Sequence, residues 1–219
     1  MEMKVRSKEI ERILRDSGIG RDWDEIDKTP SFVVHHMHKW DHGYCEWWGT
    51  KVYEGGIYET GDWFWGTRRS FYADFQDMLS FFSCYFQVAR IDTCIAAPCW
   101  QYHQFEFGRF VPENDICEET YLLLREHGIR KGERSGILLD IRNDQASIEL
   151  VLEGGFRGYT TLCLLCPERQ LLLTPDHHFG VTFYTQNLHQ EESVVKKILE
   201  EFPSLCFWNK ETRGRQGDG

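Results

Sequence analysis

The sequence contains no long apolar run. Its longest hydrophobic stretches, such as residues 162–166, are far shorter than the roughly 20 apolar residues that a membrane-spanning helix needs. At the N-terminus, residues 1–6 alternate charged and apolar side chains and lack the continuous hydrophobic block of a secretory signal. These two absences predict a soluble protein that stays in the cytoplasm.

Positive charge is also scarce. Lysine and arginine total 25 residues against 35 aspartate and glutamate residues, which gives a formal net charge of −10 at pH 7. An acidic chain without a lysine-rich face is repelled by phosphate groups, so the charge argues against general nucleic-acid binding. A basic protein partner is compatible with this charge.

Several catalytic signatures are missing. The chain has no Gly-x-Ser-x-Gly nucleophile elbow, no Gly-x-x-x-x-Gly-Lys phosphate loop and no Gly-x-Gly-x-x-Gly dinucleotide fingerprint. These absences weaken an enzymatic interpretation without excluding one.

The eight cysteines are scattered, and many lie in apolar, strand-like segments. Free cysteine behaves in this way as a small buried hydrophobe, so we expect reduced thiols rather than four disulfides. Cys163 and Cys166 have the spacing of a metal or redox pair. In a strand, however, residues three apart point to opposite faces, which argues against a shared site.

Aromatic content is high, at 15% of the chain, and the hydrophobic periodicities favour an α+β fold. We expect a mainly antiparallel, twisted sheet with a C-terminal β-meander and three to four helices packed on one side. The expected helices are capped by Ser7, Ser70, Asp115 and Asn187 and end near residues 18, 82, 127 and 203. The expected strands span residues 32–40, 44–53, 85–97, 137–141, 147–152, 159–166, 170–173, 180–185 and 205–208, with turns at 143–144, 154–155 and 167–168.

Domain organisation is predicted to be simple. Residues 1–210 form one globular domain, residues 130–135 are the one candidate for a sub-domain break, and the polar residues 211–219 form a disordered tail.

A histidine-rich segment provides the candidate metal site. If this segment is a strand, His36 and His38 share one face at a spacing from which two imidazoles can bind zinc or another divalent metal. A third ligand would come from Asp41 or His42 close by, or from Asp176, His177 or His178 in a distant turn. The alternative is that these are ordinary surface or half-buried histidines.

The candidate partner-binding surface is a segment in which aromatic rings alternate with carboxylates. Tryptophan and tyrosine dominate protein interfaces, and carboxylates between them can pair with lysine or arginine on a basic partner. The rings can instead pack against the sheet, and a tryptophan-rich surface can also stack on sugars. The candidate residues are Glu46, Trp47, Trp48, Glu54, Tyr58, Glu59, Asp62, Trp63 and Trp65.

Two functional hypotheses follow from the sequence. The first is a non-enzymatic cytoplasmic binding protein that needs no cofactor and engages a basic protein partner, as an immunity or inhibitor protein does. The second is a metal-dependent hydrolase with a His-x-His site at His36 and His38.

Overall fold

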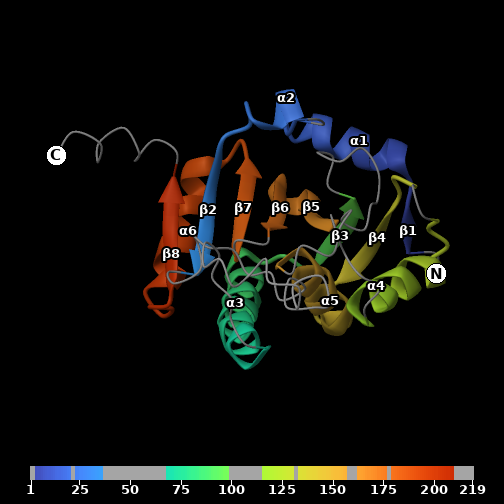
Figure 1. Ribbon diagram of the computed structural model, residues 1–219. Coiled ribbons are helices and arrows are strands. Elements are labelled where there is room, and N and C mark those ends of the chain that lie inside the picture. Colours follow the sequence, from blue (N-terminus) through green and yellow to red (C-terminus); the bar gives the residue numbers. More distant parts are fainter. Residues whose placement is uncertain are drawn as a thin grey trace, which may run out of the picture.

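The computed structural model describes residues 3–20, 23–36, 68–98, 115–130, 133–156, 162–176 and 179–209 (Figure 1). Within these ranges the chain builds an eight-stranded sheet in which all neighbouring strands are antiparallel. The strand order is β1-β4-β3-β5-β6-β7-β2-β8. The strands are β1 (Lys4–Val5), β2 (Ser31–His36), β3 (Thr93–Pro98), β4 (Gly136–Asp140), β5 (Leu162–Cys166), β6 (Leu171–Asp176), β7 (Gly180–Thr185) and β8 (Leu205–Asn209).

Helices cover both faces of the sheet. The alternation of side chains along β3 shows the division, because Cys94 and Ala96 join the core beneath α3, α4, α5 and α6, whereas Ile95 and Ala97 join the core beneath α1 and α2. The predicted α+β class with an antiparallel sheet is therefore confirmed, but the prediction that the helices pack on one side only was wrong, because α1 and α2 cover the second face. The helices are α1 (Ser7–Asp16), α2 (Trp23–Ile26), α3 (Arg68–Ala89), α4 (Asp115–Glu126), α5 (Gln145–Phe156) and α6 (Leu188–Leu199).

The C-terminal half follows the sequence pattern closely. Strands β5, β6 and β7 form the last part of the predicted meander, with a short 3-10 turn, η4 (Pro167–Arg169), between the first two. Strand β4 does not belong to it, because β3 lies between β4 and β5. Strand β7 has the predicted bounds, and β8 is an edge strand of the described sheet, as expected. Two helix ends were also predicted correctly, since Gly18 and Gly128 adopt φ values of +65° and +71°, which favour glycine.

The predicted capping residues Ser7 and Asn187 do not make side-chain capping hydrogen bonds. Arg6 rather than Ser7 occupies the N-cap position of α1, and the Ser7 hydroxyl lies 3.5 Å from Oε1 of Glu11 inside the helix. Asn187 does occupy the N-cap position of α6, but its side chain makes no capping bond and instead donates to Gln170 Oε1 at 3.3 Å.

Strand 85–97 was predicted wrongly. Helix α3 continues to Ala89, because Tyr85, Phe86 and Ala89 extend the helical stripe of buried side chains. Arg90, with φ of +56°, ends the helix, and β3 begins only at Thr93.

Strand 147–152 was also predicted wrongly, as was the turn at residues 154–155. These residues lie in α5, where Ile148, Val151 and Leu152 are buried at helical spacing. Residues 147–150 alternate polar with apolar side chains, and this short run is also compatible with a strand. Gly155 is a packing residue, because a Cβ there would lie 2.5 Å from Cγ of Pro175 on β6.

No described helix is long and apolar enough to cross a membrane.

Candidate functional site

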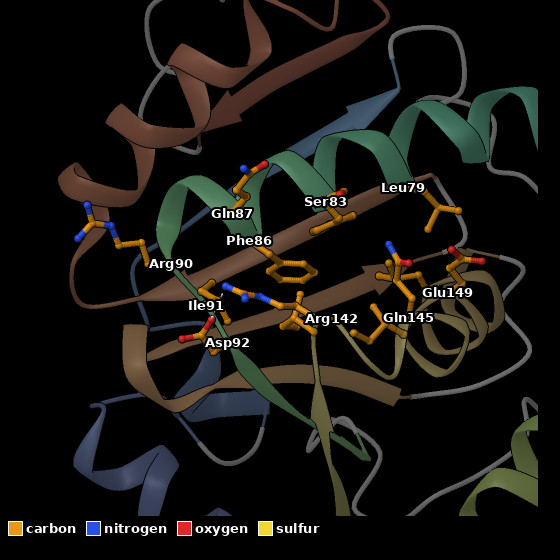
Figure 2. Close-up of a pocket in the computed structure, with 14 residues that line it drawn as sticks. Leu79, Ser83, Phe86, Gln87, Arg90, Ile91, Asp92, Arg142, Gln145 and Glu149 are labelled. Carbon is orange, nitrogen blue, oxygen red and sulfur yellow. Dashed lines mark ion pairs between the residues drawn. The ribbon is translucent and has the colours of Figure 1, made fainter.

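A groove of about 540 Å³ separates α3 from α5 on the face of the sheet that α3, α4, α5 and α6 cover (Figure 2). Helix α3 packs against α6, and α5 packs against α4, so the helical layer is split between these two pairs. The loop regions that follow α3 and β4 complete one end of the groove. Its volume lies within the range of about 300–1,000 Å³ that is typical of ligand-binding sites.

The floor of the groove is apolar and belongs to the main core. It includes Phe82 and Phe86 from α3, Ile91 just after that helix, and Ile148 and Leu152 from α5. All five are at most 5% exposed. The floor is therefore rigid and closely packed, and it offers flat apolar contact rather than large exposed side chains.

The rim carries the polar groups. Figure 2 shows Arg90 and Asp92 at one end of the groove and Glu149 at the other. Arg142 lies 3.6 Å from Asp92, and both side chains are highly exposed, so this ion pair is weak and its groups remain available to a ligand. Exposed hydrogen-bonding side chains along both walls are Ser83, Gln87 and Gln145.

The groove is closed beyond its Glu149 end. The Tyr72 hydroxyl donates to Oε1 of Glu153 at 2.9 Å, which joins the first half of α3 to the last turn of α5. Below this bond, the rings of Phe75 and Phe156 meet edge to face with centroids 6.0 Å apart. These contacts hold the two helices together beyond the Glu149 end of the groove.

A second group of polar side chains surrounds His36 at the end of β2. Its imidazole is only 4% exposed, and Nε2 lies 3.4 Å from Oδ1 of Asp74 and 3.9 Å from Oδ2 of Asp77, both on α3. The Ser204 hydroxyl, in the turn before β8, donates to the same Asp77 oxygen at 2.6 Å. An imidazole beside a carboxylate is the arrangement that general-base catalysis uses, although this imidazole is buried.

The predicted metal site is only partly covered by the structure. His36 lies on β2, whereas His38 and His178 fall outside the described residues. In the described ranges no group of three or more histidine, cysteine, aspartate or glutamate side chains is placed to bind a metal ion. The Asp74 carboxylate is 17% exposed and faces His36. His36 and Asp74 are far apart in the sequence, and only the folded chain brings them together. The local sequence pattern therefore could not predict this contact.

The predicted partner-binding segment is not covered. All nine of its residues, from Glu46 to Trp65, lie outside the described ranges. The binding surface predicted there stays a prediction.

The described cysteines are free. Cys163 and Cys166 are both buried in β5 but join the cores on opposite faces of the sheet, as the strand geometry predicted. Burial raises the pKa of Cys166, and burial with a smaller effect of Asp144 raises the pKa of Cys94 to about 12. Neither thiol is poised to act as a nucleophile.

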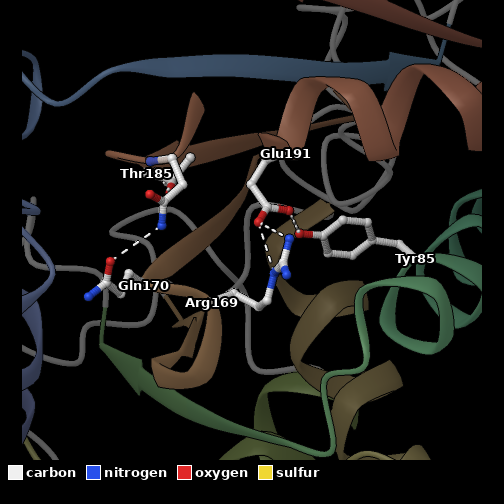
Figure 3. Close-up of polar contacts among 6 residues, drawn as sticks. Tyr85, Arg169, Gln170, Thr185 and Glu191 are labelled. Carbon is white, nitrogen blue, oxygen red and sulfur yellow. Dashed lines mark hydrogen bonds and ion pairs between the residues drawn. The ribbon is translucent and has the colours of Figure 1, made fainter. Parts of the chain in front are cut away.

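A buried polar network links α3, η4 and α6 (Figure 3). Glu191, in the first turn of α6, accepts a 2.6 Å hydrogen bond from the hydroxyl of Tyr85 on α3. The guanidinium of Arg169, from η4, pairs with the other oxygen of the same carboxylate at 2.5 Å. Because each buried group has a partner, this network is a structural joint between helices rather than a catalytic centre.

Comparison with protein-family models, with curated proteins and with solved structures finds no match to this chain.

Proposed function

We propose that this chain is a non-enzymatic binding protein that holds a segment of a basic protein partner in the α3–α5 groove. The groove itself supports the proposal, because it combines an apolar floor with a polar, open rim. Proteins that neutralise another protein, such as immunity or inhibitor proteins, need a binding surface of this kind and no catalytic centre.

The rim supplies specificity. Ser83 and Gln87 on α3 and Gln145 on α5 line the groove, so a bound segment would meet hydrogen-bonding groups from both walls. Polar groups fix the register of a ligand, while contact with the floor excludes water.

The charge of the chain supports a basic partner. A net charge of −10 attracts cationic proteins over long range and accelerates their association. At the groove, Glu149 offers a carboxylate to a lysine or arginine of the partner. The aromatic and acidic residues from Glu46 to Trp65 remain a proposed second part of the same binding surface.

The experiment compares a blocked groove with a matched control. Ser83→Trp places a large ring at the groove, whereas Val88→Trp places the same ring on an exposed part of α3 that does not line it. Both variants and the unmodified protein are used to isolate partners from extracts of the native source, and the captured protein is then purified and its affinity measured.

The expected result is a basic protein that binds the unmodified protein and Val88→Trp, binds Ser83→Trp at least tenfold more weakly, and dissociates as salt is added. Equal binding to both variants would show that the groove is not the site. The double substitution Asp62→Ala with Trp63→Ala tests the second part of the surface in the same assay.

A second candidate function is a metal-dependent hydrolase, and the observation that favours it is the placement of His36 beside Asp74. Metal content of the purified protein is compared with that of His36→Ala and His38→Ala. A stoichiometric ion that is lost in both folded variants would favour the enzyme, and protein without bound metal after incubation with zinc would eliminate it.

A further inference from the structure

The walls of the α3–α5 groove restrict the form of any partner segment that lies in it. The groove is lined by two helices and by the links that follow α3 and β4, and no residue of a strand lines it. Away from the helix ends, the backbone groups of α3 and α5 are engaged in their own helical hydrogen bonds. The groove therefore offers no strand edge with which an extended partner segment could pair.

An extended segment would also leave its own backbone without partners. Along α3 the groove runs from Leu79 to Arg90, which is about 16 Å at the helical rise per residue. About five extended residues cover this distance, and they bring about ten backbone N–H and C=O groups. The uncharged hydrogen-bonding side chains that line the groove are Ser83, Gln87 and Gln145, which are too few to satisfy those groups. A helix pairs its backbone groups internally and does not meet this cost.

The apolar surface of the groove suits one face of a helix. Its floor belongs to the main core, and Leu79 and Ile141 add partly exposed apolar surface at the margin. Side chains at positions i, i+4 and i+7 of a helix lie on one face and span about 10 Å, so three of them fit within the length of the groove. The opposite face of such a helix would remain polar and in water.

The charges at the two ends of the groove are opposite. Its charged lining residues are Arg90, Arg142 and Asp92 at one end and Glu149 at the other (Figure 2). Two guanidinium groups and one carboxylate leave a net charge of +1 at the first end, and Glu149 gives −1 at the second. A helix carries partial negative charge at its carboxyl end and partial positive charge at its amino end, because its last C=O and first N–H groups have no partner within the helix.

We propose that the segment held in the α3–α5 groove is an amphipathic α-helix whose carboxyl end lies at Arg90 and Arg142 and whose amino end lies at Glu149. The presence of a partner segment rests on the proposed function, whereas the helical form and its direction rest on the groove itself. The two guanidinium groups donate to the last carbonyls of the helix. The Glu149 carboxylate meets its first turn, where a lysine or arginine of a basic partner completes an ion pair.

The first test finds peptides that use the groove. Random peptides of about 16 residues, displayed on phage, are selected on the immobilised unmodified protein and then synthesised. A groove-dependent peptide is one that binds the unmodified protein and Val88→Trp alike and binds Ser83→Trp at least tenfold more weakly. We expect the groove-dependent peptides to repeat apolar residues at i, i+4 and i+7. Circular dichroism and melting temperatures establish that the variants are folded.

The second test examines the helical form of the bound peptide. Proline at a central position of its polar face should weaken binding at least tenfold, because proline breaks a helix without removing a contact to the groove. Alanine at the same position is the matched control and should change the affinity less than threefold.

The third test examines the direction of the helix. A photoreactive group at the carboxyl end of the peptide should cross-link to residues 90–92 or 141–142, and the same group at the amino end should cross-link to α5 near Glu149, as mass spectrometry identifies. Arg142→Glu should weaken binding about two- to fivefold at low salt. Arg12→Glu is the matched charge reversal on α1, which covers the other face of the sheet, and should leave the affinity unchanged.

Three results would overturn the proposal: a selection that yields no groove-dependent peptide, groove-dependent peptides that tolerate proline, or cross-links in the reverse direction. Because these peptides are selected without the native partner, failure to capture a basic protein from extracts contradicts the proposed function alone. A captured partner that Ser83→Trp weakens, and whose bound segment tolerates proline, would support the proposed function and reject the helix.

Discussion

The hydroxyl of Tyr85 and the carboxylate of Glu191, which are 106 residues apart in the sequence, form a 2.6 Å hydrogen bond in the interior. This bond joins α3 to α6, and Arg169 compensates the charge of a glutamate that is only 1% exposed. Burial raises the pKa of Tyr85 well above its usual range, with a further contribution from the neighbouring Glu191 charge. The tyrosine is therefore a neutral donor over the accessible pH range.

Removing Arg169 should destabilise the fold strongly. Arg169→Met leaves the Glu191 carboxylate buried without its cation, for which we expect a loss of about 3–5 kcal/mol in the free energy of unfolding. Tyr85→Phe removes one hydrogen bond to a charged group and should cost about 1.5–3 kcal/mol. Urea denaturation of the three proteins measures both losses.

The double variant Arg169→Met with Glu191→Met is the control for this network. It removes both charges, so it should be more stable than Arg169→Met alone. If the double variant were the least stable of the set, the cost would come from lost packing rather than from an uncompensated charge.

The parts of the fold that the sequence predicts are those with strong local signals. Gly18 and Gly128 mark helix ends by a backbone conformation that depends on each residue alone, and β7 alternates apolar and polar side chains from Val181 to Phe183. In α5 the predicted strand 147–152 alternates polar and apolar side chains only as far as Leu150, whereas the buried residues Ile148, Val151 and Leu152 follow helical spacing.

Long-range polar pairs could not be predicted for a different reason. Glu191 has the sequence context of a surface residue near a helix start, and its burial depends on where α3 and η4 lie. The placement of Asp74 beside His36 likewise depends on how α3 crosses the end of β2. In both cases the identity of the residues is visible in the sequence but the partner is not.

Gly155→Ala should destabilise the protein, which reverses the usual effect of this change inside a helix. Alanine has a better helix propensity than glycine by about 1 kcal/mol. Here the added Cβ would meet Pro175 at 2.5 Å, so α5 must shift away from β6 at a cost of about 1–3 kcal/mol.

Thermal unfolding of Gly155→Ala and of the unmodified protein gives the measurement for this prediction. We expect the lower melting temperature for Gly155→Ala. A Gly155→Ala protein as stable as the unmodified one would mean that α5 and β6 do not approach as closely as the structure shows.

Thiol reactivity should divide the described cysteines into two groups. Cys94, Cys163 and Cys166 are fully buried, and the raised pKa values of Cys94 and Cys166 also disfavour the reactive thiolate. Cys84 and Cys206 are partly exposed. Brief alkylation of the native protein at pH 8, followed by peptide mass spectrometry, should modify Cys84 and Cys206 first. Equal labelling of all five under native conditions would contradict the buried placement of β3 and β5.

The free energy of unfolding should decrease in acid because of Glu133. This residue lies in the segment before β4 and pairs with Lys4 of the edge strand β1. The hydrogen bond from the Lys4 ammonium is the main cause that lowers the pKa of Glu133 from 4.5 to about 2, and the Ser135 hydroxyl and the Arg130 backbone N–H also donate to it. Because the pKa is lower in the folded state, this carboxylate stabilises the fold at pH values above about 4.5. That contribution is lost as the pH falls from about 4.5 to about 2.

Lys4→Met should remove most of this acid sensitivity. The variant should be less stable than the unmodified protein at neutral pH, by no more than about 1 kcal/mol because the pair is partly exposed, and the difference should shrink as the pH approaches 2. Urea midpoints across this pH range measure the difference, with Lys8→Met on the exposed side of α1 as the matched control. A Lys4→Met difference that stays constant with pH, or that Lys8→Met reproduces, would show that the Glu133 carboxylate does not depend on Lys4.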